Sequence, residues 1–435
     1  MINIFFKIFV IFLLYACADK SLIISEDRDE VFPANQQLII NDEAANENFD
    51  LGPEISNTTY THLGFNKSRS GGHLSGPKSN LKTVWSKDIG KGTNKNSPSM
   101  PNLIGNNDFI YAMDTTGKLT SLNAKSGRVE WSITISDREN SYTASSGGLS
   151  IYNNNLYAHL GGLNLVALSS LTGEMLWEKN FNVPIISGPT SNSKGVFITL
   201  IDGTLKFLLK ENGELIWERK VISNIDDVMS TASVSVNEDT VVVPDFGGGI
   251  SVLALEDGSY LWEDNLALLA PKTAIEQLST IKAEPSIFEG KIFVVAQNGR
   301  LASYDLNNSK MVWEQSISGN QVIWIAGSSI FAISDKAELI CLRKVDGSIR
   351  WITKLPSKID QNLLRYQKFI PHFGPVVGSN KVYVAGSDKK LRVFNYKDGK
   401  LIEEKKFSNS FSTPPILINS TLYILDDNAK LFAFE

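Results

Sequence analysis

The sequence contains little cysteine and little histidine, which narrows the chemistry that it can carry. Cys17 and Cys341 are the only cysteines among 435 residues, and no CxxC or CxxCH pattern occurs. A zinc cluster, an attached haem and a disulfide framework are therefore excluded. Cys341 lies in the apolar stretch "ELICLR", where a lone thiol is most simply a small core residue. The four histidines have no catalytic or metal-binding motif around them: His62, His73, His159 and His372.

A strong charge of one sign is also missing. The formal net charge is −5, and the segment from Asp19 to Glu54 alone has ten acidic and two basic residues. The rest of the chain is therefore close to neutral and has no field that would gather a polyanion. We expect no nucleic-acid partner.

No apolar run is long enough to span a bilayer as a helix. The longest N-terminal run, Ile8 to Ala16, instead fits the apolar region of a signal peptide over residues 1–16. It ends in "LYAC", which resembles the lipobox of bacterial lipoproteins and makes Cys17 the expected lipid attachment site. The alternative is an ordinary secretory signal with an incidental cysteine. Residues 17–60 are acidic and aperiodic, and they predict a lipoprotein tether with at most an ordered patch at "QQLII".

What the sequence does have is a repeat of about 45 residues. Each unit has short apolar runs separated by glycine turns, followed by a run that carries tryptophan, as in "FIYAMDTTGKLTSLNAKSGRVEWSI". A further short segment with proline or small residues precedes each unit. Four strands per unit at this period predict the blades of a β-propeller. The repeated tryptophans are Trp85, Trp131, Trp177, Trp217, Trp262, Trp313 and Trp351.

The two ends of the repeat region complement each other. The C-terminal "TLYILDDNAKLFAFE" stops before its tryptophan strand, whereas "LKTVWSKDIG" around Trp85 has no hairpin before it. An N-terminal strand that completes the last blade would close the ring and remove an open sheet edge. We therefore predict an all-β chain with a single eight-bladed β-propeller over residues 61–435. One unit has Glu403 where the tryptophan would stand.

The recurrence of the tryptophans also bears on their role. A cofactor site needs unlike residues that converge once, whereas a residue that occurs once per blade serves a need that recurs in every blade. We expect each indole to fill the space between neighbouring blades and to donate its N–H to a carbonyl. Gly173 and its equivalents would supply the turns.

The units resemble pyrroloquinoline quinone (PQQ) repeats, best in "SLTGEMLWEKN". From Cys17 to the C-terminus the chain resembles the lipoprotein B subunit of the outer-membrane β-barrel assembly machinery. The stretch "TAIEQLSTIKAEPSIFEGKIFVVAQNGRLASYDLNNSKMVW" is similar to that subunit over a whole blade, and "GHLSGPKSNLKTVWSKDIGKG" resembles the start of the propeller in α-proteobacterial members. The resemblance implies a non-catalytic scaffold that assists insertion of β-barrel proteins. It implies the central barrel subunit, nascent outer-membrane proteins and, through the lipid, the membrane as partners. Ala18 after Cys17 favours the periplasmic face of the outer membrane.

The resemblance implies two stretches that dock on the central barrel subunit, and both differ in this sequence from the family's pattern. The loop with the family's Leu-Arg pair corresponds to "DDVMS", and the family's paired aspartates fall on Thr280 and Lys282. A plain surface loop is as good an interpretation of these residues as a binding role. The predicted partner-binding residues are Asp226, Asp227, Val228, Met229, Thr280 and Lys282.

A PQQ-dependent quinoprotein dehydrogenase is the enzymatic alternative, and an envelope lipoprotein with another binding role is a third. The enzymes are longer chains, and many have adjacent cysteines that are missing here. Aspartates such as Asp114, Asp202, Asp335 and Asp388 are scattered over turns, one per blade, where an aspartate hydrogen-bonds its own backbone. No D-x-D-x-D-G calcium loop or G-x-S-x-G elbow occurs. We therefore predict no catalytic residue, metal, cofactor or small-molecule substrate.

Overall fold

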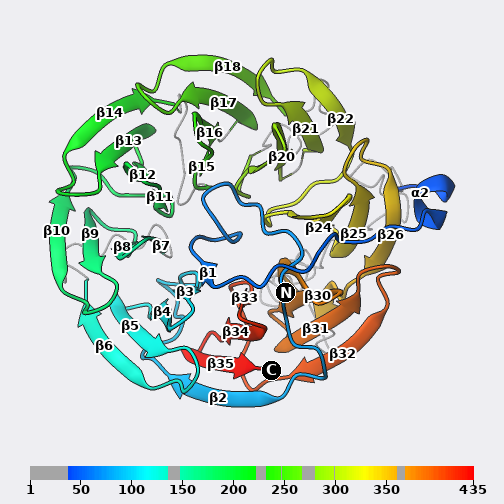
Figure 1. The fold of residues 1–435 in the computed structure, drawn as a ribbon, viewed down its shortest axis with the longest axis horizontal. Coiled ribbons are helices and arrows are strands. Elements are labelled where there is room, and N and C mark those ends of the chain that lie inside the picture. The colour runs from blue at the N-terminus through cyan, green and yellow to red at the C-terminus, as the bar shows by residue number, and fades with distance from the viewer. Residues whose placement is uncertain are drawn as a thin grey trace, which may run out of the picture. The chain divides into compact units, whose positions relative to one another are not determined.

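The computed structural model describes residues 38–135, 147–221, 232–245, 247–266, 280–297, 299–359 and 368–435. Residues 38–435 form one compact unit, built almost entirely of antiparallel strands. Eight sheets follow one another around a ring (Figure 1). In this part of the chain, no helix has the length and hydrophobicity that a membrane span requires.

The sheets are numbered as blades 1 to 8 in the order of their inner strands. Blade 1 consists of β1 (Thr59–Tyr60), β3 (Ile104–Asn106), β4 (Phe109–Met113), β5 (Lys118–Asn123) and β6 (Val129–Thr134). Blade 2 consists of β7 (Gly148–Tyr152), β8 (Asn155–His159), β9 (Asn164–Ser169) and β10 (Met175–Asn180). Blade 3 consists of β11 (Thr190–Ser191), β12 (Gly195–Thr199), β13 (Thr204–Leu209) and β14 (Leu215–Lys220). Blade 4 consists of β15 (Ser235–Val236), β16 (Thr240–Pro244), β17 (Gly249–Ala254) and β18 (Tyr260–Asn265).

The second half of the ring follows the same plan. Blade 5 consists of β19 (Ser286–Phe288), β20 (Lys291–Val295), β21 (Leu301–Asp305) and β22 (Met311–Gln315). Blade 6 consists of β23 (Trp324–Ala326), β24 (Ser329–Ile333), β25 (Glu338–Arg343) and β26 (Ile349–Lys354). Blade 7 consists of β29 (His372–Gly378), β30 (Lys381–Gly386), β31 (Lys390–Asn395) and β32 (Leu401–Lys406). Blade 8 consists of β33 (Ile416–Ile418), β34 (Thr421–Leu425), β35 (Lys430–Phe434) and β2 (Thr83–Asp88); a separate pair is β27 (Lys358–Ile359) with β28 (Lys368–Phe369).

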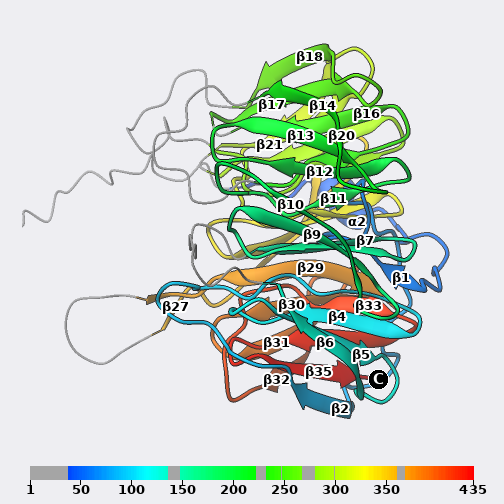
Figure 2. The same cartoon turned by 90° about the vertical axis from the view of Figure 1, so that its left-hand side faces the viewer.

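The predicted closure of the ring is confirmed. Strand β2 pairs antiparallel with β35, with Trp85 opposite Ala433, so an N-terminal strand completes the C-terminal blade. Figure 2 shows β2 and β35 side by side at the lower edge of the ring. The two middle strands of each blade are the most buried because both of their faces lie against neighbouring blades, and they read as nearly continuous apolar runs.

Each repeat tryptophan packs against the next blade, as the spacing predicts. The Trp131 indole donates to Ser170 O at 3.1 Å and lies under Gly173, where an added Cβ would come within 2.7 Å of the ring. Gly173 has φ +72°, a conformation that glycine adopts without strain. The other indoles donate to equivalent carbonyls: Trp85 to Ala124, Trp177 to Lys210, Trp217 to Leu255, Trp262 to Leu306, Trp313 to Lys344 and Trp351 to Tyr396.

One boundary differs from the sequence prediction. Residues 38–60, which the sequence assigns to the tether, pack on the propeller: Phe49 and Leu51 are in the core, and β1 pairs with β3. The short helix α2 (Asp42–Asn46) lies against β26. The segment has no periodic pattern because it contacts the ring through single anchors. Residues 1–37, which include the predicted signal peptide and Cys17, lie outside the described residues.

Candidate functional site

A segment that runs through the centre of the ring forms one side of the candidate site. Residues 55–76, called the strap here, cross the ring centre between α2 and β2 (Figure 1). The strap reaches the inner strands in the order of the blades. The first half of the strap contacts blades 8, 1, 2 and 3: Asn57 with Leu417 and Asn419, Thr59–Tyr60 with β3, Thr61 with Ile151, and His62 with Ser191. The second half contacts blades 4, 5, 6 and 7: Lys67 with Val236, Ser68 with Ile287, Gly72 with Ile325, and Leu74 with Val377.

These contacts are mostly backbone hydrogen bonds. The innermost strand of a blade has a free edge, and an edge that is buried without partners is costly. The strap supplies partners to all eight edges. It therefore joins the blades at the centre of the ring, as the tryptophans join them farther out.

Arg69 and His62 of the strap are both buried. The Arg69 guanidinium donates to Leu63 O at 3.0 Å, Thr190 Oγ1 at 2.7 Å and Val234 O at 3.1 Å. Desolvation lowers the pKa of Arg69 to about 10, although the nearby Glu284 carboxyl opposes this shift. Burial, reinforced by the charge of Arg69, holds the pKa of His62 well below its usual value. Neutral His62 accepts the Ser191 N–H at 2.9 Å, so it is a structural group.

A cavity of about 230 Å³ lies between the strap and the segments that precede the inner strands. Tyr60, Leu63, Gly64 and Arg69 line it from the strap, and residues from all eight blades complete the wall. Glu284 and Lys282 carry the other charges of the lining. The Glu284 carboxylate accepts the Ser233 N–H at 3.3 Å, and burial raises its pKa. The cavity is smaller than the usual range of about 300–1,000 Å³ for ligand sites.

The described lining of the cavity has one carboxylate, Glu284, whereas a quinone enzyme needs several oxygen ligands around a metal ion. Such an enzyme holds PQQ beside a Ca²⁺ ion with several oxygen ligands and a carboxylate base. Within the described ranges, no group of three or more His, Cys, Asp or Glu side chains could hold a metal ion. The residues described therefore do not fit a PQQ–calcium pair.

The histidines and the cysteine of the described chain are structural. His159 is buried, accepts the Gly161 N–H at 3.0 Å, and has its pKa lowered by desolvation to about 4. His73 and His372 contact backbone groups. Burial raises the pKa of Cys341 to about 12, which makes it an unreactive thiol.

Only two of the six predicted partner-binding residues, Thr280 and Lys282, lie in the part of the chain that the structure describes. Asp226, Asp227, Val228 and Met229 lie outside the described residues. Thr280 exchanges two backbone hydrogen bonds with Gln297, and Lys282 lines the cavity. The sequence analysis missed Arg69 and Glu284. Single charged residues in an aperiodic stretch and before a strand give no signal until the ring brings them together.

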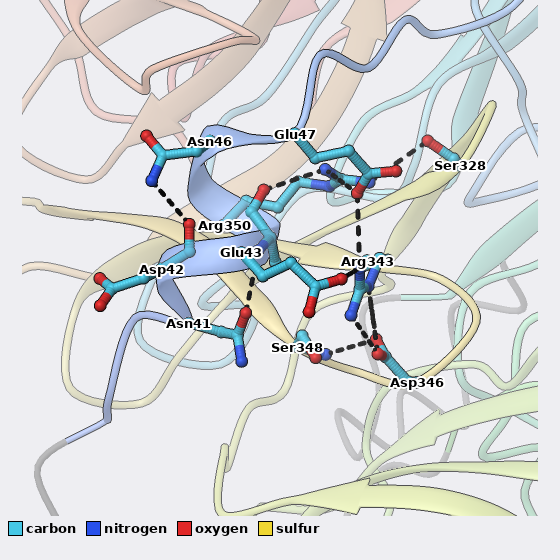
Figure 3. Close-up of polar contacts among 11 residues, drawn as sticks. Asn41, Asp42, Glu43, Asn46, Glu47, Ser328, Arg343, Asp346, Ser348 and Arg350 are labelled. Atoms are coloured by element: carbon cyan, nitrogen blue, oxygen red, sulfur yellow. Dashed lines mark hydrogen bonds and ion pairs between the residues drawn. The ribbon is translucent and has the colours of Figure 1, made fainter.

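A polar cluster on the outer rim fixes the chain where the described part begins (Figure 3). Arg350, which is only 2% exposed, donates to Glu47 Oε2 at 2.9 Å and to Ala44 O at 3.2 Å. Arg343 forms ion pairs with Glu43 at 3.1 Å and with Asp346 at 2.6 Å. Residues 38–51, called the clasp here, are thereby held on blade 6.

The comparisons with known proteins agree with this geometry. The sequence profile of the family described as "Outer membrane protein assembly factor BamB" matches residues 70–159 and 138–353. The BamB of Yersinia pestis is 21% identical over 358 residues, with 81% of this chain and 88% of that protein covered. The BamB of Escherichia coli K12 is 22% identical over 356 residues, with 81% and 88% covered.

Solved structures with a similar fold include a BamB protein and a quinohemoprotein alcohol dehydrogenase. The structure of BamB from Moraxella catarrhalis aligns with a TM-score of 0.68 at 16% identity, over 82% of this chain and 99% of that one. The quinohemoprotein alcohol dehydrogenase of Comamonas testosteroni aligns with a TM-score of 0.66 at 10% identity, over 87% and 81%. At these identities the structural likeness concerns the fold alone.

Proposed function

The chain belongs to the family of the outer membrane protein assembly factor BamB, and from this membership we propose that it is a non-catalytic scaffold for assembling outer-membrane β-barrel proteins. The family match, which covers more than half of the chain, carries the proposal. The curated relatives that bear the assembly-factor name extend the similarity to 81% of the chain.

The site geometry favours binding over catalysis. Two buried titratable groups at the ring centre are tied into the fold: His62 accepts a backbone N–H, and Arg69 donates to oxygens of blades 3 and 4. A general acid or base must be within reach of a substrate proton. A rigid ring with variable connections suits the holding of other proteins.

We place the docking of the central barrel subunit on the connections that precede β15 and β19. These connections contain Asp226–Met229 and Thr280–Lys282. Lys282 is exposed at the cavity, so a partner that contacts it would cover the centre of the ring. The proposed location is the periplasmic face of the outer membrane, with a lipid on Cys17.

Photocrosslinking in membranes, followed by purification of the chain, tests the proposed partner. A photoreactive side chain at position 282 of the full chain should crosslink to the central barrel subunit, whereas one at the exposed Lys125, on the β5–β6 turn, should not. Recovery of no assembly-machinery subunit with either variant would contradict the proposal.

The fold shared with quinohemoprotein dehydrogenases gives the rival function a specific test. The scaffold proposal expects that purified protein mixed with PQQ and Ca²⁺ shows no bound quinone absorbance after gel filtration. Retention of the quinone together with oxidation of an alcohol would favour the enzyme.

A further inference from the structure

The outermost strand of every blade has a β-bulge at the same place. The pairing with the neighbouring strand skips the residue that precedes the repeat tryptophan, or Glu403 in blade 7. A bulge bends an edge strand and re-aims one side chain. The eight bulge residues are Val84, Glu130, Leu176, Ile216, Leu261, Val312, Arg350 and Ile402.

Most bulge residues are apolar and exposed. Five of them have between 41% and 52% of their surface exposed: Val84, Leu176, Leu261, Val312 and Ile402. In blades 2, 4 and 7 a second exposed apolar residue stands directly before the bulge, namely Met175, Tyr260 and Leu401. Scattered exposed apolar residues need no explanation, but these recur at one structural position around the rim.

Blade 6 shows what covers this position. Its bulge residue, Arg350, is buried because the clasp lies on it (Figure 3). The clasp makes two kinds of contact. The Asn41 N–H donates to Ile349 O, on the outer strand, at 3.0 Å, and the Phe49 ring lies 4.1 Å from the Arg350 guanidinium.

The aromatic ring sits between two blades. Phe49 also packs edge-to-face on Tyr396, which follows β31 of blade 7, with the ring centroids 5.6 Å apart. The clasp therefore contacts two neighbouring blades, with a polypeptide backbone on the strand edge and an aromatic side chain on the bulge residue. The other blades have the same strand order and the same bulge.

We propose that the exposed apolar bulge residues dock segments of unfolded client polypeptides that present an aromatic side chain, as Phe49 docks on Arg350 in blade 6. This proposal rests on the proposed assembly function. An aliphatic bulge residue offers an aromatic ring an apolar contact, where Arg350 offers Phe49 a cation–π contact. The free edge of the outer strand offers the client backbone hydrogen bonds.

Several equal sites on one ring change how a client is held. Each site presents only one or two exposed apolar side chains, so a single contact is weak. A long unfolded chain can occupy several of these sites at once, and each further contact forms at a high effective concentration. A ring with repeated weak sites would hold an unfolded barrel protein and still release it.

Photocrosslinking tests the location of these sites. The probe is an outer-membrane β-barrel protein unfolded in urea and diluted into buffer with the full chain. A photoreactive side chain in place of Leu176 or Leu261 should capture the probe several-fold more than one in place of Glu178 or Glu263. Those controls are exposed and lie two residues farther along the same strands. Equal capture at all four positions would overturn the proposal.

Substitutions test the chemistry. The double variant Leu176→Glu with Leu261→Glu should weaken probe binding several-fold while the Tm stays within a few degrees, because both side chains are exposed. Phe49→Ala should uncover Arg350 and increase the binding of the probe to the chain. If the wild type binds the probe and neither variant changes this binding, the proposed docking sites are wrong but the proposed function is not affected. No binding to the wild type would overturn both the docking sites and the client-binding part of the proposed function.

Discussion

At the residue scale, the blades are joined by a repeated pair of residues. A tryptophan of one blade lies under a positive-φ glycine of the next, and the indole N–H satisfies the carbonyl just after the third strand of that next blade. Glycine is needed for two reasons. A residue with a Cβ would be strained at this positive φ, and its Cβ would also clash with the indole. Blade 5 is an exception, because Ser309 takes the glycine position with φ +60° and Trp262 still donates to Leu306 O.

Gly173→Ala separates these two needs. The added methyl would meet the Trp131 ring at 2.7 Å, so we expect a loss of about 2–4 kcal/mol in the free energy of unfolding, from strain and overpacking together. Gly290→Ala is the matched control, because Gly290 has φ +69° with nothing within 4 Å. It should cost only about 1–2 kcal/mol. Urea titrations measure both values, and equal losses would contradict the packing role of the tryptophan.

The buried His159 predicts a loss of stability in acid. Its pKa is about 4 in the folded chain and about 6.5 when unfolded. Between these values the unfolded chain binds more protons, so stability falls as the pH drops from about 6.5 to 4, by roughly 3 kcal/mol for this group. His62 acts in the same direction. Urea titrations at several pH values should show a smaller loss for His159→Gln, and a flat wild-type profile would refute this prediction.

At the element scale, the ring seam between blades 7 and 8 uses different chemistry. Glu403 stands in the tryptophan position, and its carboxylate accepts the Leu81 N–H at 3.1 Å. Lys405 donates to Leu81 O at 2.9 Å. Leu81 occupies the position of the turn glycine, four residues before Trp85, and its side chain is buried in the core. The sequence showed the missing tryptophan but not this replacement.

Glu403→Ala should loosen the seam. The half-buried Leu81 N–H would lose its acceptor, so we expect a loss of about 1–3 kcal/mol in the free energy of unfolding. Glu403→Gln keeps an acceptor oxygen and should lose less. Chemical denaturation compares the two variants, and equal losses would mean that charge, not the hydrogen bond, holds the seam.

The sequence predicts the blades well because the features that build them recur. Turn glycines, apolar runs and tryptophans return in each unit, so the strand count and the closing strand around Trp85 follow from the pattern. The strap and the clasp have no such pattern. Their contacts are made largely by backbone groups, or by single side chains such as Arg69 and Phe49. Neither kind of contact leaves a recurring pattern in the sequence from which it could be predicted.

The candidate site is less predictable than the fold for the same reason. Lys282 was selected by family resemblance, and the structure places it at the cavity. Arg69 and Glu284 are 215 positions apart in sequence and meet only because the strap crosses the ring.

At the scale of the whole molecule, the strap makes the eight blades one unit. Cleavage at an inserted protease site after the exposed Lys78 would separate residues 1–78 from the rest of the chain. We expect the two fragments to stay together in gel filtration, because the strap contacts all eight blades, while the Tm falls. Loss of the N-terminal fragment with an unchanged Tm would show that the strap is dispensable.

The proposed role of this propeller in assembling outer-membrane β-barrel proteins can be measured in the cell. The protein would be depleted from its own cells, and the outer membrane would then be analysed by quantitative proteomics. We expect the amounts of β-barrel proteins to fall several-fold while unrelated envelope lipoproteins keep their level. Unchanged amounts of folded β-barrel proteins after complete depletion would contradict the proposed role.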